Sequence, residues 1–299
     1  MKPHISIFIP TKNAGVEFKT VLEKIYNQQE LHLELIIVDS GSTDHTLEIV
    51  TRYPAKVIKI NPEEFRHGKT RNMALTYSSA DYIVFLSQDA VPADEYWLSN
   101  LLRNFSDEKT AGVFSKQIPR KKTHEIQRFF YMYYFPETKI VRPNKLYNSI
   151  QNRFFSNVSS CIKKEVLQKY PFDNSILTTE DQEWANRIIK SGYKTVYEPE
   201  SIVIHSHNHR LKQIFKGYFD SASAQSEITR KEYVDFKKNS KQYITKEFIH
   251  ILNNKPTEIP YWITNNIAKV TGIFLGLQDK KLPIFWKKKF SSNNYYWCK

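Results

Sequence analysis

The chain alternates short apolar runs with segments whose apolar residues recur at helical spacing. Because each apolar run is short and rich in β-branched and aromatic residues, we predict strands at residues 5–9, 34–38, 55–60 and 82–86. The segments between them predict helices through Val21, Leu22 and Ile25, over 43–52 and over 68–79. Strands of this kind, alternating with helices, are typical of a mostly parallel central sheet with helices on both faces. The pattern therefore predicts an α/β fold.

Three of the predicted strands end directly on polar residues. These ends are Pro10-Thr11-Lys12-Asn13, Asp39-Ser40-Gly41-Ser42 and Ser87-Gln88-Asp89. The carboxyl ends of parallel strands meet at one edge of a sheet, where open α/β folds bind their ligands. We therefore expect a polar rim above an apolar sheet, in the manner of a Rossmann-like nucleotide-binding fold.

The second half of the chain has a weaker pattern. Residues 120–155 are basic and aromatic with mixed periodicity, and we interpret them as an excursion beside the rim. The tail from 240 to 299 mixes polar, aromatic and basic residues. Between these regions the sequence predicts helices at 160–169, 180–191 and 210–235, and two short extended pieces around Pro199 within 194–204.

Composition narrows the class of protein. The 299 residues are 40% hydrophobic, enough to bury a core, and carry a formal net charge of +13 with a pI near 9.4. Such a charge favours anionic partners: nucleic acid, nucleotides or an anionic membrane surface. The two cysteines, Cys161 and Cys298, make no disulfide framework and favour a reducing, cytoplasmic location. We see no leader peptide and no apolar run of 18 residues, so no membrane span is expected.

Two strand-end carboxylates are candidates for nucleotide and metal binding. Asp39, in the run VDSGSTD, can accept hydrogen bonds from a base or ribose, although an ordinary strand–turn–helix junction has the same pattern. Asp89 suits Mg²⁺ or Mn²⁺, since these ions take oxygen ligands and usually keep substrate phosphates in their shell. Ser87 stands where a second aspartate would strengthen that site. Arg71, near Lys69 in the run GKTRN, can contact phosphate or pair with a core carboxylate.

Two further segments carry candidate chemistry. Glu180 and Asp181 begin a predicted helix, where a carboxylate is either a favourable cap charge or, at the edge of a pocket, a general base. In an extended piece, His205, His207 and His209 would lie on one face, a spacing that suits metal binding but also occurs in surface clusters. Zinc hydrolysis is disfavoured, because no HExxH motif or cysteine pair accompanies them.

In chain order, the motifs PTKN, VDSGSTD, GKTRN, SQDA, TTED and HSH resemble the family 2 inverting glycosyltransferases with the GT-A fold. The resemblance is strongest to the bacterial rhamnosyltransferases that build surface polysaccharides, and it covers roughly residues 3–235. The tail ending NNYYW is also similar to that branch. The resemblance implies a GT-A glycosyltransferase domain at 1–235, with a nucleotide-sugar-binding half at 1–115 and an acceptor and catalytic half at 116–235. A mainly helical, basic and aromatic extension would follow at 236–299.

The resemblance also implies a role for each motif. Asp181, with Glu180 beside it, matches the catalytic base. Asp89 matches the last carboxylate of the family's D-x-D metal motif, and His205 or His207 matches the late histidine that completes the shell of Mg²⁺ or Mn²⁺. The first aspartate of that motif is missing here, which gives a Gln-Asp-Ala variant. The nucleotide sugar would lie against Pro10, Thr11, Asn13, Asp39, Ser40, Lys69, Arg71, Gln88 and Asp89.

The activity implied by the resemblance is transfer of a sugar with inversion at its anomeric carbon. The expected donor is dTDP-L-rhamnose and the expected acceptor is a lipid-linked glycan. Segment 270–290 would then lie on a membrane surface with its lysines attracted to anionic lipid, or else form a packing helix followed by a solvated basic tail. A peripheral position at the inner face of the cell membrane fits the first alternative.

Two rival functions remain open. A family 2 transferase with a UDP-hexose donor would use the same residues. A basic nucleic-acid-binding protein would explain the basic and aromatic residues between 120 and 155. It would not explain carboxylates at the strand ends, which repel phosphates unless a metal lies between them, so nucleic acid is not expected as a partner.

Overall fold

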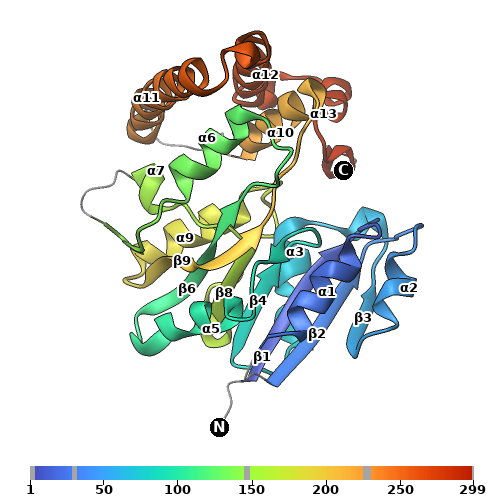
Figure 1. Ribbon diagram of the computed structural model, residues 1–299. Helices are drawn as coiled ribbons and strands as arrows, with labels where there is room; N and C mark the ends of the chain where they lie inside the picture. The colour runs from blue at the N-terminus through green and yellow to red at the C-terminus, as the bar shows by residue number, and fades with distance from the viewer. Residues whose placement is uncertain (1–3, 29–31, 145–148, 225–229, 298–299) are drawn as a thin grey trace.

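The strands of this protein form one mixed sheet (Figure 1). The computed structural model describes residues 4–28, 32–144, 149–224 and 230–297. Within them, nine strands join in the order β3-β2-β1-β4-β8-β6-β9-β5, and β7 pairs with β9. The strands are β1 His4–Thr11, β2 His32–Asp39, β3 Ala55–Lys59, β4 Tyr82–Leu86, β5 Val91–Pro92, β6 Thr110–Ile118, β7 Ile140–Arg142, β8 Ser159–Lys163 and β9 Lys194–Ile204.

Six of these strands, β1, β2, β3, β4, β6 and β9, point in the same direction. β8 runs antiparallel between β4 and β6, while β5 and β7 run antiparallel to β9. The register places Thr11 beside Asp39 and Ile118 beside Ile204, each at the end of its strand. The carboxyl ends of the six strands therefore share one edge, and the predicted α/β sheet is confirmed.

Helices cover both faces of this sheet and build the C-terminal part of the molecule. Short 3₁₀ turns occur at Pro62–Glu64, Arg103–Ser106, Pro256–Glu258, Asp279–Lys281 and Asn294–Trp297. The helices are α1 Phe18–Tyr26, α2 Thr46–Val50, α3 His67–Asn72, α4 Ala74–Tyr77, α5 Trp97–Leu102, α6 Glu125–Tyr134, α7 Ser149–Asn152, α8 Lys164–Lys169, α9 Glu180–Lys190, α10 Leu211–Ala224, α11 Arg230–Asn254, α12 Ile259–Gly276 and α13 Ile284–Phe290.

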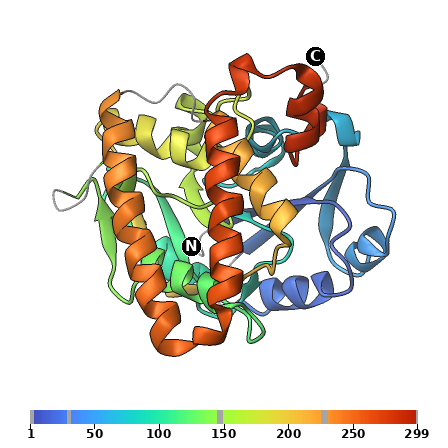
Figure 2. The ribbon, with the colours of Figure 1, turned by 90° about the horizontal axis from the view of Figure 1, so that it is seen from above.

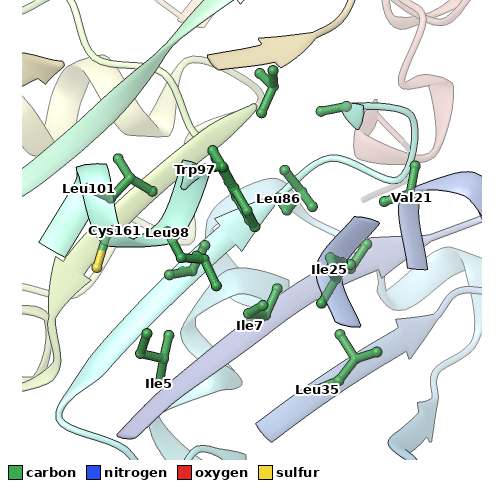
Figure 3. Packing of buried hydrophobic residues seen from close by; sticks show 14 of the residues in the cluster. Ile5, Ile7, Val21, Ile25, Leu35, Leu86, Trp97, Leu98, Leu101 and Cys161 are labelled. Carbon is green, nitrogen blue, oxygen red and sulfur yellow. The ribbon is translucent and has the colours of Figure 1, made fainter. Parts of the chain in front are cut away.

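Alternate residues of the central strands enter two hydrophobic cores, one on each face of the sheet. Ile7 and Ile9 of β1 lie in the first core with Trp97 of α5, whereas Phe8 lies in the second with Trp184 of α9. Figure 3 shows the first core, where Trp97 and Ile7 fill the space between the sheet and the helices above it. Each such side chain contributes roughly 2–3 kcal/mol on burial, so the sheet is a rigid base for its polar edge.

The C-terminal helices pack closely on one another. Gly272 and Gly276 of α12 face α10, and a Cβ at these positions would collide with the backbone carbonyls of Phe215 and Phe219. Seen from above, α11 and α12 lie side by side (Figure 2). The mainly helical C-terminal extension predicted from the sequence is confirmed. Among the described residues, no helix combines the length and apolar character that crossing a bilayer requires.

The pattern of residues 160–169 predicts one helix, but the structure has a strand followed by a helix there. Ser159–Lys163 form β8 at the centre of the sheet, and only then does α8 begin. The pattern misleads because β8 starts with two serines that are fully buried. Their hydroxyls find partners far along the chain or in a turn: Trp97 Nε1 donates to Ser159 at 2.9 Å, and Ser160 donates to Asn157 Oδ1 at 2.8 Å.

Other predicted elements differ at their boundaries. Residues 194–204 form one strand, β9, rather than two pieces, because pairing with β6 continues past a register shift near Pro199. The helix predicted at 43–52 is reduced to α2, since Asp44 Oδ1 accepts the Thr46 N–H at 3.0 Å and fixes the helix start there. The helix predicted at 68–79 is divided into α3 and α4.

Two predicted segments include residues outside the described part of the chain. The excursion at 120–155 contains α6 and β7, and its residues 145–148 are not described. The single helix predicted at 210–235 is two helices, α10 and α11, and residues 225–229 between them are not described. The proposed boundary between the domain and its extension, residue 235, lies within α11.

Candidate functional site

A cavity of about 420 Å³ opens at the edge where β1, β2 and β4 end. The segments after these strands line one wall, residues before and within α3 line a second, and the C-terminal segment lines a third. The cavity therefore lies at the rim that the sequence predicts. The residues around it are Pro10, Thr11, Lys12, Ser40, Pro62, Phe65, His67, Arg71, Ser87, Gln88, Asp89, Ser292, Asn293 and Tyr295.

The turn after β2 is fixed by Asp39. Its buried carboxylate accepts, through Oδ2, hydrogen bonds from the N–H groups of Gly41 (3.1 Å) and Ser42 (3.0 Å). Gly41 has φ +85°, a left-handed conformation that favours glycine. Oδ1 of Asp39 faces the Thr11 hydroxyl at 3.4 Å. Asp39 thus stabilises the turn that places Ser40 at the cavity.

Asn13 and Gln88 connect the ends of neighbouring strands. Asn13 has a left-handed backbone, with φ 49°, and its Oδ1 accepts a hydrogen bond from the Thr43 N–H at 2.8 Å. The Asn13 N–H in turn donates to Ser42 Oγ at 2.8 Å. Gln88 Oε1 accepts from the Lys12 N–H at 2.8 Å, and Gln88 Nε2 donates to the Lys12 carbonyl at 3.2 Å. These bonds hold the ends of β1, β2 and β4 in one rim.

Asp89, His205 and His207 form a compact cluster beside the cavity. His207 Nε2 lies 3.0 Å from Asp89 Oδ2, and His205 Nε2 lies 3.6 Å from Asp89 Oδ1. Burial acts to raise the pKa of Asp89, but the hydrogen bond from His207 and the charges of both histidines and Arg120 outweigh it, and the pKa falls to about 2. Burial lowers the pKa of His205 to about 4. At neutral pH the Asp89 carboxylate is therefore ionised and the His205 imidazole is neutral, and these are the states that bind a metal ion.

Polar neighbours orient this cluster. The side-chain oxygen Oε1 of Gln117 lies 3.2 Å from His205 Nδ1, so a proton on Nδ1 leaves the lone pair of Nε2 facing Asp89. Arg120 joins the two segments, since its guanidinium donates to the backbone carbonyls of Asp89 and Ser206, both at 2.9 Å. The three ligand atoms lie within 4.8 Å of one another. One carboxylate and two imidazoles form a mixed oxygen and nitrogen ligand set for a divalent ion, which suits Mn²⁺ better than Mg²⁺ because Mg²⁺ prefers oxygen ligands.

A second pair of carboxylates lies where α9 begins. Arg71 Nη1 donates to Glu180 Oε1 at 2.7 Å, and both side chains are largely buried. Asp181 accepts backbone hydrogen bonds from Asn157 (3.0 Å) and Gln182 (2.9 Å). Burial, followed by the charge of Glu180, raises the pKa of Asp181 to about 7. Burial acts in the same sense on Glu180, but Arg71 outweighs it and lowers that pKa. Asp181 is thus able to take up a proton near neutral pH.

The backbone just before these carboxylates is strained. Thr179 has φ 65°, a left-handed conformation that a β-branched residue rarely adopts and that costs roughly 1–2 kcal/mol. This turn starts α9 directly at Glu180, so both carboxylates lie in the first turn, where the helix dipole favours negative charge. Backbone strain of this kind clusters at functional sites.

Some of the predicted residues line the cavity, and the others lie beside it or away from it. Lys69 is exposed on α3, away from the lining of the cavity. His205 to His209 follow β9 as irregular chain, and the His209 ring stacks on His207 with centroids 5.0 Å apart, outside the ligand cluster. Glu180, which pairs with Arg71, and Asp181 do not line the cavity, and neither do Asn13 and Asp39. The predicted residues that line the cavity itself are Pro10, Thr11, Ser40, Arg71, Gln88 and Asp89.

Sequence reasoning missed several residues of this site. Gln117 and Arg120 reach the cluster of Asp89, His205 and His207 only because β6 lies beside β9 in the sheet. The C-terminal residues Ser292, Asn293 and Tyr295 reach the cavity from the other end of the chain. The basic cluster around Arg120 and the similarity of the NNYYW tail to one branch of a family were the available signals.

Known proteins that resemble this chain are sugar transferases. The model of the family described as Glycosyl transferase family 2 matches residues 6–170. The chain is 32% identical over 305 residues to the O-antigen chain rhamnosyltransferase WbaN of Salmonella anatum, covering 99% of this chain and 96% of that protein. It is 31% identical over 302 residues to the O-antigen chain rhamnosyltransferase RfbN of Salmonella typhimurium, covering 98% and 96%.

A more distant relative and two solved structures extend this picture. The GalNAc(5)-diNAcBac-PP-undecaprenol beta-1,3-glucosyltransferase of Campylobacter jejuni is 22% identical, covering 81% of this chain and 80% of that protein. The mannosyltransferase PcManGT from Pyrobaculum calidifontis, in complex with GDP-Man and Mn²⁺, aligns with TM-score 0.59 at 19% identity, covering 94% and 76%. TarS 1–349 of S. aureus with UDP-GlcNAc aligns with TM-score 0.52 at 16% identity, covering 98% and 89%. These two likenesses show the fold, which is GT-A.

Proposed function

Because this chain belongs to glycosyl transferase family 2 and is therefore a sugar-transferring enzyme, we propose that it moves L-rhamnose from dTDP-L-rhamnose to a lipid-linked glycan with inversion. The observation that carries the proposal is similarity over nearly the whole chain to two O-antigen chain rhamnosyltransferases. A lipid-linked acceptor is supported by the undecaprenol-linked glycan in the name of the Campylobacter relative. The product would enter a bacterial surface polysaccharide.

The donor would occupy the cavity at the rim, with its diphosphate toward Asp89. Asp89, His205 and His207 would hold Mg²⁺ or Mn²⁺, which supplies positive charge against the negative charge that develops on the leaving diphosphate. Arg71 lines the same cavity with a guanidinium that the ion pair with Glu180 holds in place. The nucleoside would lie toward Thr11 and Ser40, on the turn that Asp39 stabilises.

Asp181 would act as the general base. Its pKa of about 7 lets it remain ionised in a large fraction of molecules at neutral pH and still accept a proton. The hydroxyl of the acceptor gives its proton to Asp181 while its oxygen bonds to the anomeric carbon, and the bond from that carbon to the diphosphate breaks on the opposite face. Glu180, paired with Arg71, keeps its charge and so holds the pKa of Asp181 high.

The exposed face of α12 supports a position at the membrane surface. Ile263, Ile267, Val270 and Phe274 recur at spacings of three and four, and they are 47–63% exposed. Lys269 is the one charged residue of this helix, and its Nζ points inward to Glu247 Oε1 at 3.4 Å. The α12 face therefore offers apolar side chains without charge, in the part of the molecule that Figure 2 views from above.

Aromatic and basic residues continue this face beyond α12. Phe285 and Trp286 of α13 are 64% and 40% exposed. Exposed apolar side chains together with lysines in the same part of the chain match an anionic bilayer, which takes the apolar side chains into its interface and attracts the ammonium groups. We propose that this face docks on the inner surface of the cell membrane, close to a lipid-linked acceptor. The lysines concerned are Lys280, Lys281, Lys287, Lys288 and Lys289.

Vesicle flotation tests the membrane proposal. Phe274→Glu with Phe285→Glu is expected to abolish recovery with vesicles containing phosphatidylglycerol, whereas Val57→Glu, at an exposed site on the edge strand β3, should float like the wild type. Substitutions are preferable to truncation from residue 280, which would also remove the third wall of the cavity. Equal flotation of the wild type, the double variant and Val57→Glu would contradict membrane binding through this face.

Label transfer tests the reaction itself. Enzyme is incubated with dTDP-L-rhamnose labelled in the sugar, Mn²⁺ and membranes from a bacterial strain that lacks this enzyme. The expected result is label in the organic extract that contains polyprenol-linked glycans. Label incorporated only from a UDP-hexose would replace the donor and keep the fold and site, and no incorporation from either donor would contradict the proposal.

A further inference from the structure

We infer that the C-terminal segment, residues 291–297, is part of the donor site and that Tyr295 and Asn293 form the wall that covers the nucleoside diphosphate. This inference rests on the proposed function, because it takes the cavity as the donor site. Ser292, Asn293 and Tyr295 line the cavity together with the ends of β1, β2 and β4. In Figure 1 the C-terminal end of the chain lies on the side of the sheet where these strands end.

Two side chains of α10 hold the start of the segment. Lys216 Nζ donates to the Ser291 carbonyl at 2.8 Å, and Asp220, one helical turn later, accepts through Oδ2 from the Ser292 N–H (2.9 Å) and Asn293 Nδ2 (3.1 Å). Ser291 is fully buried, and its Oγ accepts the Asn293 N–H at 2.9 Å. Two side chains of α10 thus fix the turn that leads into the cavity lining.

The far end of the segment contacts the loop before α9 and helix α13. The Tyr296 hydroxyl donates to the Ser175 carbonyl at 2.7 Å, in the loop that leads to Glu180 and Asp181. Lys287 of α13 lies over the Trp297 ring, with Nζ 4.9 Å from its centroid. The segment therefore runs from α10 to the loop before α9, and three of its residues line the cavity between these anchors in sequence, Ser292, Asn293 and Tyr295.

Tyr295 presents its ring, rather than its hydroxyl, to the site. The hydroxyl donates to Asn293 Oδ1 at 2.6 Å, and Asn293 is itself held by Asp220. The Arg66 guanidinium lies over the Tyr295 ring, 4.9 Å from the centroid, which fixes the ring in place. Burial raises the pKa of Tyr295 to about 12, so the phenol stays neutral. A neutral aromatic ring locked beside the cavity suits packing against a base or ribose.

The rest of the lining has the chemistry of a nucleoside diphosphate site. Phe65 and Pro62 add apolar surface next to the Tyr295 ring, which suits a planar base. Asp89 is the one acid among the residues that line the cavity, while Lys12 and Arg71 bring positive charge. Within the described part of the chain, the exposed Lys12 ammonium takes part in no ion pair, so it is available to a phosphate.

Calorimetric binding of dTDP in the presence of Mn²⁺ tests the inference. Tyr295→Ala is expected to raise the Kd about tenfold, which corresponds to about 1.4 kcal/mol and lies in the range of base–aromatic stacking. Tyr295→Phe keeps the ring and should stay within about threefold of the wild type. Tyr96→Ala is the matched control, because it also removes a tyrosine ring, and this ring is 53% exposed and does not line the cavity.

Hydrogen exchange on the wild type keeps the test independent of how the variants fold. The inference predicts that dTDP slows exchange of the amides in residues 291–297. A Kd for Tyr295→Ala within twofold of the wild type, together with unprotected amides, would overturn the inference and leave the proposed function intact. Wild-type protein that binds neither dTDP nor UDP would instead overturn the proposed function, and the inference with it.

Discussion

Two walls of the same cavity are built in different ways. The strand-end wall, at residues 10–13, 39–42 and 87–89, is held by backbone register and by turn side chains that bond to nearby backbone N–H groups. The C-terminal wall, at residues 291–297, is held by side chains of α10 and by the loop before α9. The first wall follows from the sheet, whereas the second exists only when the C-terminal helices are packed. Substituting functional side chains of the first wall should lower the rate of transfer, while disturbing the second wall should weaken binding of the donor.

The largest effect is expected outside both walls, at the proposed base where α9 begins. Asp181→Asn should lower the rate of transfer on the order of 10³-fold, because an amide cannot take the proton of the acceptor hydroxyl. Binding of dTDP should stay within about twofold of the wild type. Glu183→Gln, two residues later on the same helix, removes a carboxylate that pairs with Arg187 and should change the rate little. Equal loss in both variants would show a structural role for the start of α9 instead of catalysis.

The next effect is expected at the metal cluster. Asp89→Asn should lower Mn²⁺-dependent transfer on the order of 10²-fold and remove the ability of Mn²⁺ to tighten dTDP binding, since it removes the one carboxylate ligand. Asp94→Asn is the control, because Asp94 lies shortly after Asp89, beyond β5, and accepts the Tyr96 N–H instead. If Asp89→Asn retained full stimulation by Mn²⁺, the metal would bind elsewhere.

The dependence of the C-terminal wall on helix packing gives a pair of matched glycine variants. Gly276→Ala should lower the free energy of unfolding by about 1–3 kcal/mol, because its Cβ collides with the Phe219 carbonyl, and it should weaken dTDP binding by displacing Asp220. Gly217→Ala, on α10, places its Cβ in open space and should stabilise by about 0.5–1 kcal/mol without changing dTDP affinity. Thermal unfolding and calorimetry measure both. Unchanged dTDP affinity in a destabilised Gly276→Ala protein would show that the C-terminal wall does not depend on the packing of α12 on α10.

The smallest effect is a shift in pH dependence. The base acts when ionised, so the rate should fall as pH drops below the pKa of Asp181, about 7. Burial raises this pKa first and the charge of Glu180 raises it further, so Glu180→Gln should lower it and move the acid limb of the pH–rate profile down by roughly one unit. Without Glu180 as its partner, Arg71 would keep an unpaired positive charge near Asp181, which also lowers the pKa of Asp181. An acid limb that stays in place would show that Glu180 does not set the pKa of the base.

The sequence predicts the strand-end wall better than it predicts the C-terminal wall. Strand ends such as Asp39 and Asp89, and the helix start at Glu180 and Asp181, are visible because a run of apolar residues stops at a polar one. The pattern also predicts the α/β class, since strands and helices alternate over the first 86 residues.

The remaining features depend on contacts between distant segments. β8 was not visible because its serines are satisfied by Trp97 and Asn157 inside the folded core. Gln117 meets His205 only through the pairing of β6 with β9. Tyr295 meets the cavity only after α10 and α12 have packed, so no local pattern around residue 295 marks it as part of a site.

The most direct test of the central claim is release of nucleoside diphosphate from a panel of nucleotide sugars, with Mn²⁺ or with EDTA and in the presence of the acceptor-containing lipid extract. The account predicts release from dTDP-L-rhamnose alone, abolished by EDTA and by Asp181→Asn. Release from UDP-sugars but not from dTDP-L-rhamnose, or release that neither EDTA nor Asp181→Asn reduces, would contradict it.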